Sequence, residues 1–428
     1  MPTIIGPDQT GFIKGRYFGE NARILHETIE YINNLNENGL IFFSDFNKAF
    51  DSLDHNFMRK CLLKFEFPQF IINWVNLFYK DEKSCKHNNG HLSSFFNIEK
   101  GVRQGCPLSP YLFINCIELL SNEINLNKDI NGIKIGNIEL KQTLFADDAC
   151  FITDGEKKSF QTLVTTIENF SKVSGLKLNK DKCTVLHLGS LRNTEVNFCK
   201  DKHFNWTSKK ATTLGIIFSN NSNEMLNANL SPKIKEFELC LHKWSRWKLS
   251  LLGKITVLKS FAVPKLIYPL TVLHSSDQVC INKIKKTMFQ FLWDNKPDKI
   301  SREKNIQDYG HGGLKMLEID KFIKSLKCSW VKRIKLQTDS KWVQLYETML
   351  NKYGKQFLFK SNLNSQDMER LEIKSRFLKD ILGAWSYANF KDKISYFGKE
   401  FIWNNTNIKI KIKALFTLQL AGERHCLY

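Results

Sequence analysis

The chain lacks closely spaced cysteines and a secretory leader. Its eleven cysteines are scattered without a C-x-x-C pair, and no short Cys/His cluster has the spacing of a zinc site. We therefore expect reduced thiols rather than disulfides or zinc ligands. Residues 1–10 also lack a basic start followed by a long apolar run, so we expect an intracellular protein, cytoplasmic or nuclear.

A long uninterrupted hydrophobic run is also absent. The most apolar stretch, residues 255–273, is interrupted by Lys259, Pro264, Lys265 and Pro269, which argues against a membrane span. Acidic residues are in the minority, because 63 Lys and Arg against 43 Asp and Glu give a net charge of +20. This excess favours a polyanionic partner. Without a membrane segment, nucleic acid is the better candidate.

Internal repeats and long low-complexity tracts are missing, which argues against a solenoid. The chain of 428 residues, 42% of them apolar, can form two to four domains. Apolar spacing predicts alternating helices and strands, then an Asn- and Ser-rich linker at residues 219–229, then mainly helices. The expected helices lie near residues 24–32, 57–64, 70–79, 112–120 and 160–170, and the expected strands near 40–43 and 143–152.

Three aspartates stand where predicted strands end. Asp45 follows a continuous apolar strand, and Asp147 and Asp148 occupy a predicted tight turn between two short strands. If those strands are neighbours, three carboxylates converge and either take up protons or bind a hard cation, for which oxygen ligands favour Mg²⁺. Two such ions can support phosphoryl transfer. Taken alone, the same residues also fit a polar turn and a helix cap, where Asp is common.

Six motifs along the chain resemble those of one enzyme family. They read Q-T-G-F-I-K-G-R at 9–16, D-F-N-K-A-F-D at 45–51, G-V-R-Q-G-C-P-L-S-P at 101–110, F-A-D-D at 145–148, G-L-K-L-N-K-D-K-C at 175–183 and T-L-G at 213–215. In this order they resemble the reverse transcriptases of non-LTR retrotransposons, the LINE-type elements. A group II intron maturase or telomerase-like polymerase would share the metal chemistry, but F-A-D-D and the G-G-L sequence at 312–314 favour the LINE type.

The resemblance implies an α+β, right-hand polymerase fold. Fingers and palm, with an antiparallel sheet and helices, would span residues 1–218, a helical thumb 219–275, and a helical C-terminal region of unknown role 276–428. It implies an RNA-directed DNA polymerase that uses an RNA template, a DNA primer, deoxynucleoside triphosphates and two Mg²⁺ ions, with Mn²⁺ as a substitute. Only eight residues precede Gln9, so the alternative is a truncated, inactive remnant that only binds nucleic acid.

The family motifs assign roles around the aspartates. Asp45 and Asp147 would be the principal metal ligands, Asp148 would help to hold the second ion, and the backbone carbonyl of Phe46 would add an oxygen. Phe50 stands where the family places an aromatic ring against the sugar of the incoming nucleotide, which would exclude a 2′-hydroxyl. Without the motif, Phe50 is better explained as a core aromatic residue.

The resemblance implies further nucleotide contacts at the motif at residues 101–110, which lies between the two aspartate-containing motifs. Gln104 and Gly105 would form a turn against the nucleotide and templating base, since glycine allows close backbone approach, and Arg103 would add positive charge. In isolation this segment is only a turn and a helix start. Lys182 resembles the family's proton donor to pyrophosphate. Lys180 is a rival, and both also fit solvated surface lysines.

A basic strip without acidic residues lies within residues 243–265. We define it as six cations that the sequence favours for phosphate contacts: Lys243, Arg246, Lys248, Lys254, Lys259 and Lys265. Trp244 and Trp247 have helical spacing and are expected in the core. The wording W-S-R-W-K-L-S-L-L-G-K resembles the family's thumb, which grips the template and primer.

Overall fold

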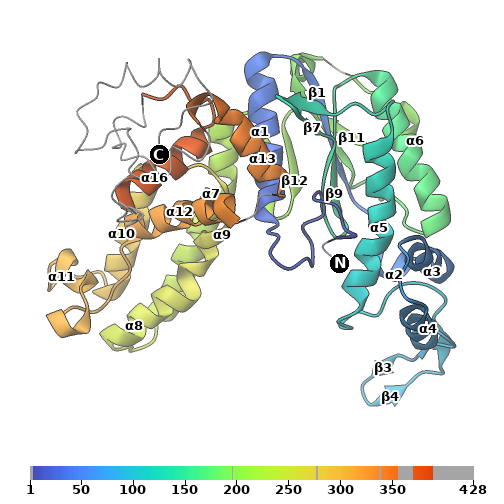
Figure 1. Ribbon diagram of the computed structural model, residues 1–428. Helices are drawn as coiled ribbons and strands as arrows, with labels where there is room; N and C mark the ends of the chain where they lie inside the picture. Colours follow the sequence, from blue (N-terminus) through green and yellow to red (C-terminus); the bar gives the residue numbers. More distant parts are fainter. Residues whose placement is uncertain (1–2, 195, 276–277, 337–338, 355–369, 389–428) are drawn as a thin grey trace, which may run out of the picture. The chain divides into compact units, whose positions relative to one another are not determined.

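The computed structural model describes residues 3–194, 196–275, 278–336, 339–354 and 370–388 (Figure 1). The chain divides into two compact units: the first comprises Met1–Ser222 with Asp339–Trp342, and the second comprises Asn223–Thr338 with Val343–Tyr428. The first unit contains a sheet and helices, and the second is helical in its described part. The predicted α+β class is therefore confirmed.

A five-stranded sheet organises the first unit in the order β11-β10-β1-β9-β8. Strand β1 lies at its centre and pairs antiparallel with both β9 and β10, whereas β11 pairs parallel with β10. The apolar run at residues 40–43 is buried, as expected for a central strand. The strands are β1 (Asn38–Ser44), β8 (Gln142–Phe145), β9 (Asp148–Thr153), β10 (Thr184–Gly189) and β11 (Asn205–Thr207).

Helices cover both faces of this sheet (Figure 1). Helix α1 (Gly19–Leu35) packs on β8 and β10, while α5 (Ser109–Leu126) packs against α6 (Lys157–Ser174). Successive residues of β1 serve opposite faces: Phe42 contacts Phe160 of α6, whereas Phe43 contacts Phe218. The alternation fixes which carboxylates can meet at the end of the strand, because a one-residue slip would reverse every side chain.

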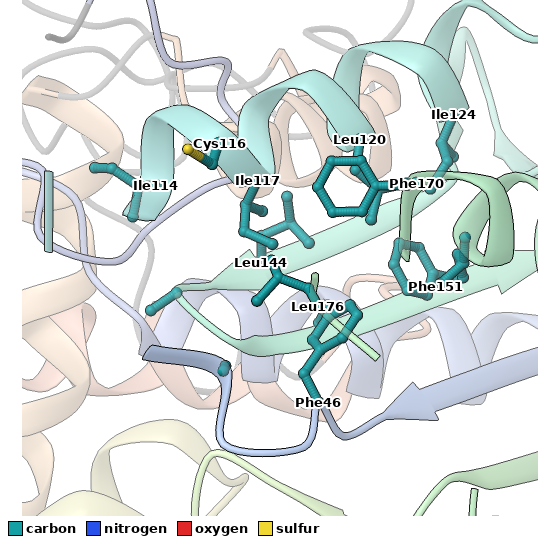
Figure 2. Packing of buried hydrophobic residues seen from close by; sticks show 14 of the residues in the cluster. Phe46, Ile114, Cys116, Ile117, Leu120, Ile124, Leu144, Phe151, Phe170 and Leu176 are labelled. Atoms are coloured by element: carbon teal, nitrogen blue, oxygen red, sulfur yellow. The ribbon is translucent and has the colours of Figure 1, made fainter. Parts of the chain in front are cut away.

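The main core of the first unit lies between the sheet, α5 and α6. Figure 2 shows Leu120, Phe151 and Phe170 among the side chains that meet there. The predicted stripe at residues 160–170 forms the buried face of α6. That helix ends at Gly175, whose φ of 80° and N–H bond to the Ser171 carbonyl complete a glycine C-cap. Helix α5 begins at Ser109 with Pro110 in its first turn and has no side-chain cap.

Smaller elements complete the first unit. The predicted helices near residues 57–64 and 70–79 are confirmed as α3 (His55–Lys64) and α4 (Gln69–Phe78). The others are α2 (Ala49–Ser52), β2 (Lys83–Ser84), β3 (His87–Asn88), β4 (His91–Leu92), β5 (Phe96–Asn97), β6 (Ile133–Ile135), β7 (Ile138–Leu140), β12 (Lys210–Thr213) and β13 (Ile216–Ser219).

In its described part, the second unit is built from helices, as the loss of strand patterns predicted. Its core takes residues from Leu230 to Ile323, so one core crosses the boundary expected between 275 and 276. The described α-helices and the π-helix from this part of the chain are α7 (Ser222–Ser245), α8 (Leu251–Val257), the π-helix Leu258–Ala262, α9 (Pro264–Val272), α10 (Gln278–Leu292), α11 (Arg302–Ile306), α12 (Ile319–Leu336), α13 (Lys341–Met349) and α16 (Arg376–Ala388).

The linker expected at residues 219–229 is wrong for most of its length. Helix α7 begins at Ser222, and Met225, Asn229 and Leu230 form its first buried positions. The Asn- and Ser-rich composition is a poor helix former by itself, but burial of an apolar face stabilises a helix more than intrinsic propensity does.

Within the described residues, no single helix is long and apolar enough to cross a membrane. One bent helix pair, Leu251–Ala262 with Pro264–Val272, is long and apolar enough when its two helices are taken together.

Candidate active site

The aspartates lie at one end of two adjacent strands. Strand β1 runs antiparallel to β9, and Ser44 pairs with Ala149. Asp45 follows Ser44, and Asp148 precedes Ala149 as the first residue of β9. The two carboxylate-bearing positions are therefore neighbours across the sheet, which is the condition on which the predicted cluster depended.

The predicted acidic turn joins β8 to β9. Phe145 pairs with Asp148, which leaves Ala146 and Asp147 as a two-residue connection. Ala146 is buried and has a left-handed φ of 52°, a conformation that costs on the order of 1–3 kcal/mol for a residue other than glycine. The surrounding structure must stabilise this turn, and it thereby fixes where the next two side chains begin.

The carboxylates disfavour one another's charge. Partial burial raises the pKa of Asp147, and the neighbouring Asp45 adds to the effect. The pKa of Asp148 is raised to about 6 by desolvation first, and then by Asp147 and Asp45. Asp148 nevertheless exposes more than a third of its surface, so water weakens both the desolvation and the repulsion that raise its pKa. No ion pair in the described part of the chain involves any of these aspartates.

The donor set fits a hard divalent cation. All three side chains offer carboxylate oxygens, and a cation between them would offset the repulsion that raises the pKa of Asp147 and Asp148. The carboxylate oxygens of the three aspartates do not all lie within 4.8 Å of one another. Among the described residues, the group that meets this distance is His26, Glu27 and Glu30. Cation binding at the aspartates therefore requires their side chains to close in.

A second segment braces the Asp45 side. The N–H of Asn179 donates to the Asp45 carbonyl at 2.7 Å, and the N–H of Asn47 donates to the Lys177 carbonyl at 2.8 Å. The Asp45 N–H lies 3.5 Å from the sulfur of Cys183. Burial raises the pKa of the Cys183 thiol to about 11, so the thiol stays neutral. The G-L-K-L-N-K-D-K-C motif thus supports Asp45, a role that sequence reasoning missed.

Phe46 and Phe50 follow Asp45 into the core. The Phe46 ring is buried (Figure 2), and its backbone forms an antiparallel bridge with Leu178. The Phe50 ring stacks on Phe113 of α5, with centroids 4.4 Å apart, and stays half-buried. The N–H of Val102 donates to the Phe50 carbonyl at 2.6 Å. Phe50 therefore packs against the core, as expected without the motif, and stays partly accessible, while its nucleotide role stays a prediction.

The predicted nucleotide turn forms, and its side chains already have protein partners. Arg103 pairs with Glu82 at 2.6 Å, so its positive charge is compensated within the first unit. Gln104 donates to the Asp51 carboxylate at 3.1 Å. Gly105 has φ of 83°, and a β-carbon there would meet nothing within 4 Å, so the backbone is open to a ligand. Contact with a nucleotide at these residues stays a prediction.

Lys180 and Lys182 are both exposed, in the turn that precedes β10. The Lys182 N–H donates to the Asn179 carbonyl at 3.1 Å, which places this lysine within the brace of Asp45. Their exposure does not decide between them, and the assignment of Lys182 as proton donor stays a prediction.

The basic strip loses one member. Lys243, Arg246, Lys248, Lys259 and Lys265 are exposed, as phosphate contacts require. Lys254 is buried, lies 2.6 Å from the Asp294 carboxylate, and donates to the Leu292 carbonyl at 3.2 Å. The prediction that Lys254 binds nucleic acid is therefore wrong, because its charge is already neutralised inside the second unit.

The two tryptophans of the strip differ. Trp244 is half-buried and lies 5.3 Å from the ring of Phe261, so its predicted core position is partly right. Trp247 is 68% exposed, and its predicted core position is wrong. Helix α7 ends at Ser245 and α8 begins at Leu251, so the two tryptophans do not share a helix face.

Comparisons with known proteins agree with these motifs. The family model "Reverse transcriptase (RNA-dependent DNA polymerase)" matches residues 1–218. "Transposon TX1 uncharacterized 149 kDa protein" of Xenopus laevis is 26% identical over 307 residues, 69% of this chain and 22% of that protein. The Pol polyprotein of "type-2 retrotransposable element R2DM" of Drosophila melanogaster is 31% identical over 177 residues, 41% of this chain and 16% of that protein.

Among solved structures, telomerase of Candida tropicalis in complex with a fragment of telomeric RNA is similar at a TM-score of 0.40 and 14% identity. That similarity covers 80% of this chain and 53% of the telomerase chain. It is too low to carry an inference about function.

Proposed function

We propose that this chain, which belongs to the reverse transcriptase (RNA-dependent DNA polymerase) family, extends a DNA primer on an RNA template. The retrotransposon relatives confirm the predicted resemblance to the LINE type. The chain spans about a fifth of the length of those relatives, 22% and 16% for the two described above. The activity is therefore proposed for this chain on the strength of its own residues.

The convergence of three aspartates carries the proposal. Asp45 and Asp147 would hold the divalent cations, Asp148 would tune the second site, and the Phe46 carbonyl would add an oxygen. When bound, two Mg²⁺ ions, or Mn²⁺ in their place, would supply the electrostatic stabilisation that nucleotidyl transfer needs. The chain's own contribution is to hold the backbone of these aspartates at two braced strand ends, so that movement of the side chains alone would bring the carboxylates around the cations.

Primer extension with an Asp147→Asn variant tests the function. We expect the wild-type chain to elongate a primed RNA template with Mg²⁺ and deoxynucleotides, and the variant to lose at least about a thousandfold in rate, because the amide cannot replace an anionic metal ligand. Asp154→Asn is the matched control, since Asp154 follows the other end of β9 and its oxygen accepts the Glu156 N–H at 3.0 Å, which an amide oxygen can also do.

The outcomes separate the two candidate functions. Equal extension by the wild type and the Asp147→Asn variant would remove the aspartates from the chemistry. Template binding by a wild-type chain that extends no primer would instead identify a nucleic-acid-binding remnant.

Phe50 gives a prediction about sugar selection. Replacing Phe50 by Val removes the ring that would face the 2′ position and leaves a smaller side chain there. We therefore expect a higher kcat/KM for ribonucleotides relative to deoxynucleotides, by roughly tenfold or more. The control is Phe57→Val, because Phe57 is another half-buried aromatic residue, packed at 5.5 Å against Phe170. Unchanged sugar discrimination in Phe50→Val would leave Phe50 as a packing residue only.

A further inference from the structure

The N-terminal segment adds an extra edge to the sheet beside the acidic turn. Gln9 forms a parallel bridge with Leu144 of β8. The Thr10 N–H donates to the Leu144 carbonyl at 2.8 Å, and the Leu144 N–H donates to the Asp8 carbonyl at 2.9 Å. The motif at residues 9–16 is therefore joined by its backbone to the strand that leads into Asp147.

The Gln9 side chain reaches the turn itself. Its Oε1 atom accepts the N–H of Gly11 at 2.8 Å and the N–H of Ala146 at 2.9 Å. Gln9 is only 1% exposed, so water does not replace it as the acceptor for these two donors. A β-carbon on Gly11 would lie 2.8 Å from the Ala146 nitrogen. Only glycine at position 11 allows the segment to approach this closely.

The orientation of the Gln9 amide follows from its partners. Rotating the amide would point its NH₂ group at two backbone N–H donors. In the observed orientation, Nε2 has no partner among the described residues. A buried amide that leaves its own donors unsatisfied is costly. Gln9 is therefore suited to one task, which is to accept the N–H of the left-handed Ala146 and of Gly11.

We infer that Gln9 is a positioning residue for Asp147, acting through Ala146. Ala146 is the residue immediately before Asp147, and its unfavourable φ of 52° persists only if neighbouring groups hold it. The Oε1 atom of Gln9 supplies the buried acceptor that the Ala146 N–H needs in this conformation. The catalytic consequence rests on the proposed polymerase function, whereas the structural role of Gln9 does not.

Gln9→Met tests the inference, because methionine matches the length of glutamine and lacks the acceptor. Gln142→Met is the matched control: Gln142 is equally buried, lies on the same hairpin, and donates to Ser121 on α5 and to Asp8 rather than to the turn. Gln9→Glu is the rescue variant, because a carboxyl oxygen can accept both N–H groups. The readouts are amide hydrogen exchange of a peptide spanning residues 145–149, and the single-turnover rate of primer extension.

For Gln9→Met we expect exchange in the turn to accelerate roughly tenfold, as loss of one hydrogen bond allows. We also expect extension to slow by roughly tenfold to a hundredfold with the nucleotide KM little changed, as small displacements of a reacting group do. Gln142→Met should leave both readouts near wild type even if it lowers the melting temperature, and Gln9→Glu should restore slow exchange.

Two results would overturn the inference: turn exchange in Gln9→Met that equals wild type or the Gln142→Met control, or faster exchange with an unchanged extension rate. A wild-type chain that extends no primer would sink the polymerase proposal, while the exchange comparison would still decide whether Gln9 holds the turn.

Discussion

The first unit gathers like charges, whereas the second unit buries a cation beside an anion. At the ends of β1 and β9, Asp147 and Asp148 have raised pKa values, to which neighbouring carboxylates contribute. In the second unit, Lys254 is buried at 2.6 Å from Asp294. Folding alone gives no reason to keep the first arrangement, because it costs stability. In the Lys254–Asp294 pair the two opposite charges neutralise each other, so the task of this pair is to hold the helices together.

Asp147→Asn should divide activity from stability more sharply than any other change. The extension rate falls at least about a thousandfold, as argued above, while the free energy of unfolding at pH 8 stays the same or rises. The reason is that one of three repelling charges has gone, which also lowers the pKa of Asp148 from about 6. Thermal unfolding and primer extension on the same preparation provide the measurement. A variant that loses stability in parallel with activity would undo the comparison.

Glu118 offers an intermediate case in the first unit. It is buried on α5, where it accepts the Gly6 N–H at 2.9 Å. Desolvation raises the pKa of Glu118 to about 7, and Asp8 adds to the rise, while Arg16 and Lys341 oppose it. Ion pairing of Lys341 with Asp8 already commits part of that positive charge. Glu118 is therefore only partly compensated.

Glu118→Gln should change how stability depends on pH. The folded wild type keeps the Glu118 proton up to about pH 7, whereas the unfolded chain releases it near pH 4.5, so wild-type stability falls between these values and stays low above them. The variant lacks this loss. Its advantage over wild type should grow by on the order of 3 kcal/mol from pH 5 to pH 8, measured by urea unfolding with hydrogen exchange of α5. A constant difference across that range would contradict the assignment.

The strands that carry the aspartates were predictable because the hydrophobic pattern of a strand reflects its burial. An apolar run that ends in Asp45, and a second that surrounds Asp147, predicted two buried strands. Whether these strands are neighbours was left open, and the pairing of Ser44 with Ala149 shows that they are. The residues that hold the acidic turn in place could not be predicted from the sequence. Gln9 and Ala146 are far apart in the sequence, and nothing local in Q-T-G indicates that its amide accepts a backbone N–H from F-A-D-D.

The predictions for Trp247 and Lys254 in the helical second unit were wrong for a different physical reason. Helical spacing predicts a face only while the helix continues and keeps its period. The break after Ser245 separates Trp247 from Trp244, and the π-helix Leu258–Ala262 shifts the phase of the positions that follow. The burial of Lys254 could not be predicted from its basic neighbours, since a lysine in such a segment is ordinarily solvated. Its partner Asp294 is distant in the sequence.

Asp294→Asn should expose the structural task of Lys254. The substitution removes the carboxylate and leaves the buried ammonium with the Leu292 carbonyl. We expect a loss of about 2 kcal/mol in the unfolding free energy, less than for a fully buried pair because Asp294 is itself 61% exposed. The control is Asp298→Asn, which breaks a surface pair with Arg302 and should cost less than about 0.5 kcal/mol. Equal losses in the two variants would mean that the Lys254–Asp294 pair stabilises the fold no more than a surface pair does.

The smallest effect should come from the exposed members of the basic strip. Replacing Lys243, Arg246 and Lys248 together by Gln leaves stability unchanged, because all three side chains are exposed, and we expect template and primer binding to weaken by roughly tenfold. The slope of log affinity against log salt should fall by about 0.9 for each phosphate that the variant no longer neutralises. RNA and DNA should be affected alike, since phosphate contacts carry no sequence information.

A matched charge change separates this binding surface from the overall positive charge of the chain. Lys296, Lys299 and Lys332 are equally exposed lysines of the second unit, and their replacement by Gln removes the same three charges from outside the strip. If both triple variants change affinity and salt slope equally, the strip is only part of a diffuse positive field. If the strip variant alone changes them, its exposed cations bind the duplex while the buried cation at position 254 serves the fold, and the contrast between the two kinds of charge then holds within one helical unit.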